Sequence, residues 1–272
     1  MKNKSYQLAL FGDPVHHSLS PEIHQHFAQQ FDISINYRLI AVKKEQLQEA
    51  VQEFFQSQGH GANVTLPHKQ NVMEFVHELS DLAQQAQAVN TLYKDERQII
   101  GDNTDGVGFV CDLKQRCQFS CVHKKILILG AGGATQGIVP ALMSQNPNKV
   151  VIVNRTLAKA ENIATYPNSL AVDFVQLQDL NESFDLIVHS SSLGHQGKTL
   201  KFYPQHRHEQ TIAYDLSYGA AAQAFIEHCQ SLNITQVHDG LGMLIEQAAL
   251  SFKLWFKLKP ETYDLFKSRL KD

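Results

Sequence analysis

Short apolar runs alternate with amphipathic segments along the whole chain, and this alternation predicts an α/β protein. The clearest unit lies at residues 125–156. There an apolar run (Ile126 to Leu129), a glycine-rich turn, a helical segment and a second apolar run (Val150 to Val153) follow one another. Parallel strands need a crossover connection of this kind, so this order predicts a βαβ unit.

The same alternation continues to the end of the chain, and it predicts a Rossmann-type parallel sheet for the second half. Apolar runs predict strands at residues 170–174, 184–190, 211–216 and 235–238. Residues 220–232 and 241–256 have the apolar stripe of amphipathic helices.

The first half has an α/β alternation of its own, which indicates a separate folding unit. We predict strands near residues 8–11, 37–42, 61–66, 88–93 and 97–101, and helices at 44–56, 71–88 and 107–114. A further helix is expected from Ser20, with Ser20 as its N-cap and Pro21 as its first helical residue.

The glycine-rich turn after the first strand of the βαβ unit is typical of a dinucleotide site. Gly130 can make the tight turn, and Gly132 lets the backbone approach a pyrophosphate. The following helix points its free N–H groups at the same phosphates. Thr135 stands where this fingerprint usually has Gly or Ala. The pattern alone is weak, because many strand-to-helix turns need a glycine for steric reasons.

The end of the second strand of the unit favours NADP over NAD. An NAD site places a carboxylate there, about 20 residues past the glycines, to bind the ribose 2′-hydroxyl. This chain instead has Asn154, Arg155 and Thr156, with Lys159 one turn later and no carboxylate before Glu161. An arginine suits a 2′-phosphate better than a sugar hydroxyl. The alternative is an exposed helix start with incidental charge.

Composition leaves room for one large domain or two modest ones and excludes some partners. The chain has 272 residues, 43% of them hydrophobic, and a net charge of −3. This balance predicts no nucleic-acid partner and no membrane patch. No apolar run approaches the roughly 18 residues of a membrane span, and the run at residues 8–11 is too short for a signal-peptide core. We therefore expect a cytoplasmic protein.

The cysteines and histidines do not suggest a metal site. The four cysteines (Cys111, Cys117, Cys121 and Cys229) form no CxxC pair, so they are expected to be reduced and mostly buried. The 14 histidines form no HExxH motif or His/Cys cluster. Ordinary surface or core histidines are the simpler interpretation, and we predict no metal.

Three polar groups in the first half are candidates for binding small molecules. Ser18 and Ser20 lie two residues apart beside a helix start, where both hydroxyls could hold an anion. Asn63 and Thr65 share one face of a predicted strand, with Lys69 just past its end. Asp105 stands where a helix should begin. Serines and aspartates are also common helix caps, so each signal has a purely structural alternative.

Taken in order, eight short motifs resemble the shikimate dehydrogenase family along essentially the whole chain. They are GDPVHHSLSP, GANVTLPHK, AVNTL, GDNTDGVG, GAGGA, NRT, YDLSYG and GLGMLIEQAA. The resemblance implies two α/β domains with a cleft between them. A discontinuous substrate-binding domain would comprise residues 1–104 and 241–272, and an inserted Rossmann-like NADP-binding domain residues 105–240. It also implies reversible NADPH-dependent reduction of 3-dehydroshikimate to shikimate, a step of aromatic amino acid (chorismate) biosynthesis.

The resemblance also assigns roles to individual residues. Lys69 would be the catalytic acid or base, with Asp105 as its partner. The substrate would be bound by Ser18, Ser20, Asn63, Thr65, Asn90, Asp105, Tyr218 and Gln247. NADP would be bound at its pyrophosphate by Gly130, Ala131, Gly132, Gly133 and Ala134, at its 2′-phosphate by Asn154, Arg155, Thr156 and Lys159, and on the nicotinamide side by Leu216, Gly240 and Met243. Asp81 is a weaker candidate for a cofactor contact.

Some features depart from the family, and some alternatives stay open. Many members read NATS where this chain has His189-Ser190-Ser191-Ser192, so an imidazole lies near the expected nicotinamide ribose. Gly219-Ala220 replaces the usual Asn-Pro. A quinate/shikimate dehydrogenase that also uses NAD is one alternative, and an inactive NADP-binding regulator is another. Lys69 could transfer the proton or only polarise the substrate oxygen. The partner is a small molecule, and a monomer or a homodimer is expected.

Overall fold

The computed structural model describes the backbone of residues 5–269, and it confirms the predicted α/β class. Two compact units make up the chain: Met1–Gly108 with Ile245–Asp272, and Phe109–Leu244. We call them unit 1 and unit 2. The chain leaves unit 1 within helix α4 (Asp105–Gln115) and returns to it within helix α8 (Leu241–Phe256). Unit 1 is therefore discontinuous in sequence.

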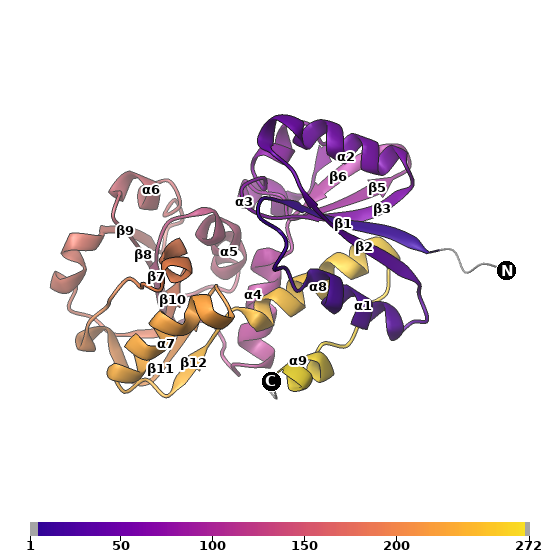
Figure 1. Cartoon of the computed structure of the whole chain (residues 1–272). Coiled ribbons are helices and arrows are strands. Elements are labelled where there is room, and N and C mark those ends of the chain that lie inside the picture. The colour runs from indigo at the N-terminus through magenta and orange to yellow at the C-terminus, as the bar shows by residue number, and fades with distance from the viewer. Residues whose placement is uncertain (1–4, 270–272) are drawn as a thin grey trace. The chain divides into compact units, whose positions relative to one another are not determined.

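Unit 1 is built on a mixed six-stranded sheet with the order β2-β1-β3-β5-β6-β4. Its strands are β1 (Tyr6–Gly12), β2 (Ile35–Ala41), β3 (Gly59–Val64), β4 (Glu78–Leu79), β5 (Thr91–Asp95) and β6 (Gln98–Asp102). The pairs of β1 with β2 and β3 are parallel, whereas β5 is antiparallel to both its neighbours. Helix α2 (Leu47–Gln56) lies on one face of this sheet, and α1 (Ser20–Gln29) and α8 lie on the other (Figure 1).

Apolar side chains fill both faces of this sheet. On the α2 face, Val51 and Phe54 pack in one buried cluster with Phe11 and Val64 of the strands. On the opposite face the packing is between aromatic rings, and Phe27 of α1 contacts Phe252 of α8 edge to face. Burial of these large side chains holds α8 to unit 1 although it lies at the far end of the sequence.

Two local predictions for unit 1 are wrong. Residues 71–88 do not form one helix but a 3-10 helix (Asn71–Glu74), strand β4 and the short helix α3 (Asp81–Ala86). The apolar residues of this segment have the spacing of a helix. However, β4 pairs with β6, and this tertiary pairing overrides the local periodicity. Ser20 is the first residue of α1, and the N-cap residue is Leu19, which makes no side-chain cap hydrogen bond.

Unit 2 is built on a parallel six-stranded sheet with the order β12-β11-β10-β7-β8-β9. Its strands are β7 (Lys125–Leu129), β8 (Lys149–Asn154), β9 (Ser169–Asp173), β10 (Phe184–His189), β11 (Arg207–Asp215) and β12 (Gln236–His238). Every pair is parallel. In sequence the strands therefore run 3-2-1-4-5-6, which is the Rossmann order, and the prediction for the second half is confirmed. The order reverses between β7 and β10.

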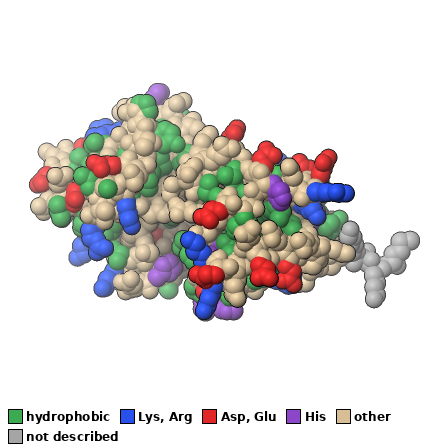
Figure 2. All heavy atoms as spheres, turned by 90° about the horizontal axis from the view of Figure 1, so that it is seen from above, with side chains coloured by type: hydrophobic (Ala, Val, Ile, Leu, Met, Phe, Trp, Pro, Cys, Tyr) green, Lys and Arg blue, Asp and Glu red, His purple; other side chains and the backbone are tan. Residues whose placement is uncertain are grey.

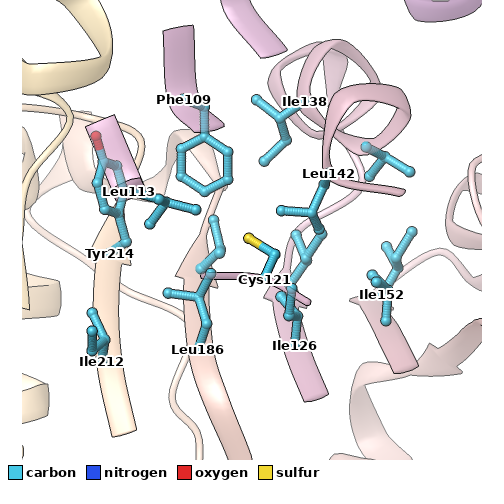
Figure 3. Packing of buried hydrophobic residues seen from close by; sticks show 14 of the residues in the cluster. Phe109, Leu113, Cys121, Ile126, Ile138, Leu142, Ile152, Leu186, Ile212 and Tyr214 are labelled. Carbon is cyan, nitrogen blue, oxygen red and sulfur yellow. The ribbon is translucent and has the colours of Figure 1, made fainter. Parts of the chain in front are cut away.

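Helices cover both faces of the unit 2 sheet and bury its apolar residues. On one face, Phe109 and Leu113 of α4 and Leu142 of α5 (Gly133–Met143) pack on Ile126 and Leu186 of the strands (Figure 3). On the other, α7 (Gln223–Ser231) packs Phe225 against the sheet. The predicted helix at 220–232 begins as a short 3-10 turn (Gly219–Ala222) before α7. Two shorter α-helices are α6 (Leu157–Glu161) in unit 2 and α9 (Tyr263–Arg269) in unit 1.

The structure also bears on the thiols, on metals and on membranes. All four cysteines are free, and all except Cys111 are buried. Among the described residues, no group of three or more His, Cys, Asp or Glu side chains is arranged to hold a metal ion. Within residues 5–269, no helix is both long enough and apolar enough to span a bilayer. Acidic and basic side chains are interspersed on the face drawn in Figure 2.

Candidate active site

Lys69 and Asp105 form an ion pair in unit 1. The Nζ atom of Lys69 lies 2.5 Å from Oδ2 of Asp105, and both side chains are largely but not fully buried. Lys69 follows the loop after β3, where its carbonyl accepts a hydrogen bond from the backbone N–H of Val89. Asp105 begins α4, and its backbone N–H donates to Oδ1 of Asn103. Hydrogen bonds therefore hold the backbone of both residues in place, and the ammonium of Lys69 lies next to the carboxylate of Asp105.

Asn90 connects this ion pair to α8. Its side-chain N–H₂ group lies 2.9 Å from Oδ1 of Asp105 and 3.1 Å from Oε1 of Gln247. Its side-chain oxygen accepts from the backbone N–H of Thr104. Gln247 comes this close because Gly108 has no side chain: a Cβ at Gly108 would lie 2.7 Å from the backbone nitrogen of Gln247. The structure therefore brings together four sequence candidates, namely Lys69, Asp105, Asn90 and Gln247.

Asn63 lies next to Asn90, and both the oxygen and the nitrogen of its side-chain amide form hydrogen bonds within the protein. Its Oδ1 accepts from the hydroxyl of Tyr37 at 2.8 Å and faces His24 at 3.2 Å. Its Nδ2 donates to Ser251 at 3.0 Å, and the carbonyl of Asn90 and the hydroxyl of Thr91 are within reach. These contacts suit a residue that positions Asn90 through the backbone rather than one that presents a free amide.

His24 is a fully buried member of this network, and no pattern in the sequence pointed to its role. Burial lowers its pKa to about 3, while the hydrogen bond with Asn63 acts in the opposite direction. The imidazole is therefore neutral at physiological pH. Since Oδ1 of Asn63 only accepts, Nε2 of His24 carries the proton. Its ring stacks on Tyr37 at 5.0 Å. Tyr37 and His24 come from different elements, so only folding shows that they support Asn63.

The other unit 1 candidates lie at the start of α1, just after β3 and at the start of α3. The hydroxyl of Ser18 donates to Oγ of Ser20 at 3.0 Å, so the two side chains are in contact, and their binding of an anion stays a prediction. Thr65 packs its methyl group against Gly12, where a Cβ would lie 2.4 Å away. Asp81 is exposed in the first turn of α3. Tyr218 is the one substrate candidate that belongs to unit 2, and burial raises its pKa.

The glycine turn of unit 2 has the shape that a pyrophosphate needs. Gly130 has φ +117°, which side chains rarely adopt. A Cβ at Gly132 or Gly133 would meet nothing within 4 Å, so the space beside the turn is open. Helix α5 has no side-chain cap at its start, which leaves its first N–H groups for a ligand. The residues present therefore fit a dinucleotide.

Thr135 explains how the turn tolerates a departure from the fingerprint. Its side chain is fully buried, and its hydroxyl donates to the carbonyl of Gly130 at 2.8 Å. The same oxygen lies 2.7 Å from Oγ of Ser190. The threonine therefore ties the glycine turn to the residues after β10, and its hydroxyl is fully paired.

The residues after β8 present exposed cations. Oδ1 of Asn154 accepts from the backbone N–H of Ala131 at 3.2 Å, which joins this segment to the glycine turn. Arg155, Thr156 and Lys159 are exposed. In the described part of the chain, neither Arg155 nor Lys159 forms an ion pair with a carboxylate. Such cations suit a 2′-phosphate.

The three candidates for the nicotinamide side are also gathered in unit 2. A Cβ at Gly240 would lie 2.2 Å from the carbonyl oxygen of Leu216, so only glycine allows this approach. The backbone N–H of Met243 donates to the hydroxyl of Tyr214 at 3.2 Å. That hydroxyl donates to Asp112 of α4 at 2.7 Å, and Arg116 pairs with the same carboxylate. Sequence reasoning missed Asp112 and Arg116, because helix periodicity reports only their spacing.

Family profiles match segments in both units of the chain. The family profile of the shikimate dehydrogenase substrate binding domain matches residues 10–92. That of shikimate / quinate 5-dehydrogenase matches residues 112–239, and that of the shikimate 5′-dehydrogenase C-terminal domain matches residues 240–265. A shikimate dehydrogenase (NADP(+)) from Janthinobacterium sp. (strain Marseille) is 37% identical over 98% of both chains.

Solved structures are similar over the same length. Shikimate 5-dehydrogenase from Thermus thermophilus, in complex with NADP(H) and shikimate, is 29% identical with a TM-score of 0.84, over 95% of this chain and 96% of that one. The enzyme from Listeria monocytogenes, in complex with shikimate and NAD, is 26% identical with a TM-score of 0.87, over 98% and 96%. In sequence and in fold, this chain belongs to the shikimate dehydrogenase family.

Proposed function

We propose that this protein is an NADP-dependent shikimate dehydrogenase that reversibly reduces 3-dehydroshikimate to shikimate, in aromatic amino acid biosynthesis. The observation that carries the proposal is the Lys69–Asp105 ion pair, joined through Asn90 to Gln247 in a chain of this family. An inactive regulator would not need an ammonium held next to a carboxylate. A cytoplasmic location stays a prediction.

The residues of unit 1 fit the chemistry of a ketone and its alcohol. Bound NADPH supplies the hydride. The protein must then deliver a proton to the oxygen that becomes negative, and the ammonium of Lys69 can donate that proton and stabilise the charge. Asp105 orients Lys69 from 2.5 Å away and compensates its charge when it is protonated. In the oxidative direction the same nitrogen accepts the proton from the alcohol.

We assign the remaining candidates to different functional groups of the substrate. Shikimate carries a carboxylate and three ring hydroxyls. Ser18 and Ser20 offer two hydroxyls to the carboxylate, next to the start of α1. Asn90, Asp105 and Gln247 meet at one point, where donors and acceptors alternate and can bind ring hydroxyls. We assign Thr65 and Tyr218 to the hydroxyls as well. Asn63 positions Asn90.

The residues of unit 2 fit NADP. We assign the pyrophosphate to residues 130–134 and the 2′-phosphate to residues 154–159. Support comes from the open space at Gly132 and from the exposed cations Arg155 and Lys159. Leu216, Gly240 and Met243 would hold the nicotinamide side. Asp81, which is exposed at the start of α3, stays a weaker candidate for a cofactor contact.

One assay tests the proposal: purified protein with shikimate and NADP, followed by the absorbance of NADPH. Parallel reactions with NAD and with quinate separate this function from a quinate/shikimate dehydrogenase of broad specificity. We expect turnover with shikimate and NADP, and much slower turnover in the other combinations. A protein that binds NADPH but oxidises no shikimate would instead be an NADP-binding regulator.

A further inference from the structure

A buried histidine at the end of β10 links an aspartate to a serine. The imidazole of His189 is fully buried, and its Nδ1 lies 2.8 Å from Oδ2 of Asp215 at the end of β11. Its Nε2 lies 2.7 Å from Oγ of Ser191. The ring stacks on Phe225 of α7, with 5.0 Å between ring centres. Asp215 also accepts from the backbone N–H of Ser217 at 2.8 Å.

The order of these groups fixes the direction of each hydrogen bond. An ionised carboxylate only accepts, so Nδ1 of the neutral imidazole carries the proton and Nε2 has a lone pair. The hydroxyl of Ser191 must then donate inward to Nε2. The same logic orients the serine of a Ser-His-Asp triad. Ser191 itself is only partly buried, so its oxygen offers lone pairs, and no proton, to a ligand.

Ser191 lies at the edge of the sheet where dinucleotides bind. His189 pairs with Leu129 at the end of β7, and the strand order reverses between these two strands. Ligands of such sheets bind outside the carboxyl ends of the strands at this reversal. The glycine turn also touches this loop, because a Cβ at Gly130 would lie 3.1 Å from the backbone nitrogen of Ser191. Finally, the backbone N–H of Leu216 donates to the carbonyl of His189.

We propose that His189 is a positioning residue of the NADP site, which holds Ser191 as a hydrogen-bond acceptor for a donor on the nicotinamide half of the cofactor. That donor is a ribose hydroxyl or the carboxamide N–H. The inference rests on the proposed function, since it requires that NADP binds in unit 2. The proposal assigns a role to the imidazole of His189, which replaces the asparagine of the NATS motif found in many members of the family.

The test uses three variants and measures NADPH binding directly, through NADPH fluorescence without shikimate. His189→Asn keeps an N–H₂ donor for Asp215 but is too short to reach Ser191. Ser191→Ala removes the acceptor, and the third variant combines both. We expect each single variant to weaken NADPH binding roughly 3- to 10-fold, and the double variant to bind like Ser191→Ala alone. Independent, multiplicative losses would overturn the proposal, as would wild-type binding by Ser191→Ala.

A cofactor analogue identifies the donor that Ser191 binds. The 3-acetylpyridine analogue of NADP lacks the carboxamide N–H. If Ser191→Ala still weakens its binding the donor is the ribose, and if not, the donor is the carboxamide.

A matched control and a stability measurement complete the design. His208 lies at the opposite end of β11, where its Nε2 is 3.6 Å from Asp185. His208→Asn also removes a histidine beside an aspartate, and it should leave NADPH binding unchanged. Thermal melting shows whether each variant is folded. Failure of the wild type to bind NADPH at all would refute the proposed function, whereas normal wild-type binding with independent losses would refute only the role of His189.

Discussion

The ammonium of Lys69 lies 2.5 Å from a carboxylate oxygen of Asp105, although 36 residues separate them in sequence. Lys69→Ala should lower kcat for shikimate oxidation by about 10²- to 10⁴-fold, because it removes the nitrogen that we propose exchanges a proton with the substrate oxygen. Lys44→Ala, at an exposed lysine of the same unit, should leave kcat unchanged. Steady-state kinetics decide this, and near-normal turnover of Lys69→Ala would exclude Lys69 as the acid or base.

Arg155→Ala should change the choice of cofactor rather than the rate with saturating substrate. Charge-assisted hydrogen bonds to a phosphate contribute roughly 1.5–3 kcal/mol, so kcat/KM for NADP should fall by about 10- to 100-fold. Activity with NAD, which lacks the 2′-phosphate, should hardly change. Lys198→Ala removes an exposed cation elsewhere in unit 2 and is the control. Equal losses with both cofactors would contradict our assignment of the 2′-phosphate site.

Gly132→Ala should separate cofactor binding from folding. The added methyl group meets no protein atom within 4 Å, so the melting temperature should stay within a few degrees of wild type. The methyl group would occupy the space assigned to the pyrophosphate, and NADPH binding should weaken at least about 10-fold.

Gly240→Ala is the informative contrast. Its methyl group would lie 2.2 Å from the carbonyl oxygen of Leu216, so the backbone must move and the melting temperature should fall clearly. Calorimetry with and without NADPH measures both variants. If Gly132→Ala binds NADPH normally, the pyrophosphate is bound elsewhere.

The buried imidazole of His24 should make the protein less stable in acid. Its pKa is about 3 in the folded state and near 6.5 when exposed, so the unfolded chain binds more protons below pH 6.5. Its contribution to stability is complete above pH 6.5 and is lost as the pH falls toward 3. Over that range His24 alone should lower the free energy of unfolding by about 1.4 kcal/mol per pH unit.

Urea unfolding at several pH values checks this effect. His24→Gln keeps a donor for Asn63 but cannot gain a proton, so the slope of stability against pH should decrease by that amount. His26→Gln changes a partly exposed histidine of the same helix and should keep the wild-type slope. An unchanged slope in His24→Gln would mean that other groups cause the acid sensitivity.

Much of unit 2 could be predicted from the amino-acid sequence alone. Its parallel strands are buried on both faces, so they appear as continuous apolar runs such as Ile126 to Leu129, and the turn at Gly130 needs a residue that tolerates a positive φ. These requirements act within single segments of the chain, so the order of residue types along the sequence shows them. The segment at 71–88 was misread because the pairing of β4 with β6, a non-local contact, decides its structure.

The roles of the polar residues depend on the folded chain. The spacing of Lys69, Asp105 and Gln247 says nothing about distance, since burial of the aromatic face of α8 is what brings Gln247 to Asn90. His24 and Tyr37 look like ordinary core residues until folding places them around Asn63. The imidazole of His189 became interpretable only once β10 and β11 had paired and placed it against Asp215. Hydrogen bonds depend on distance and direction, and these arise when separate segments pack.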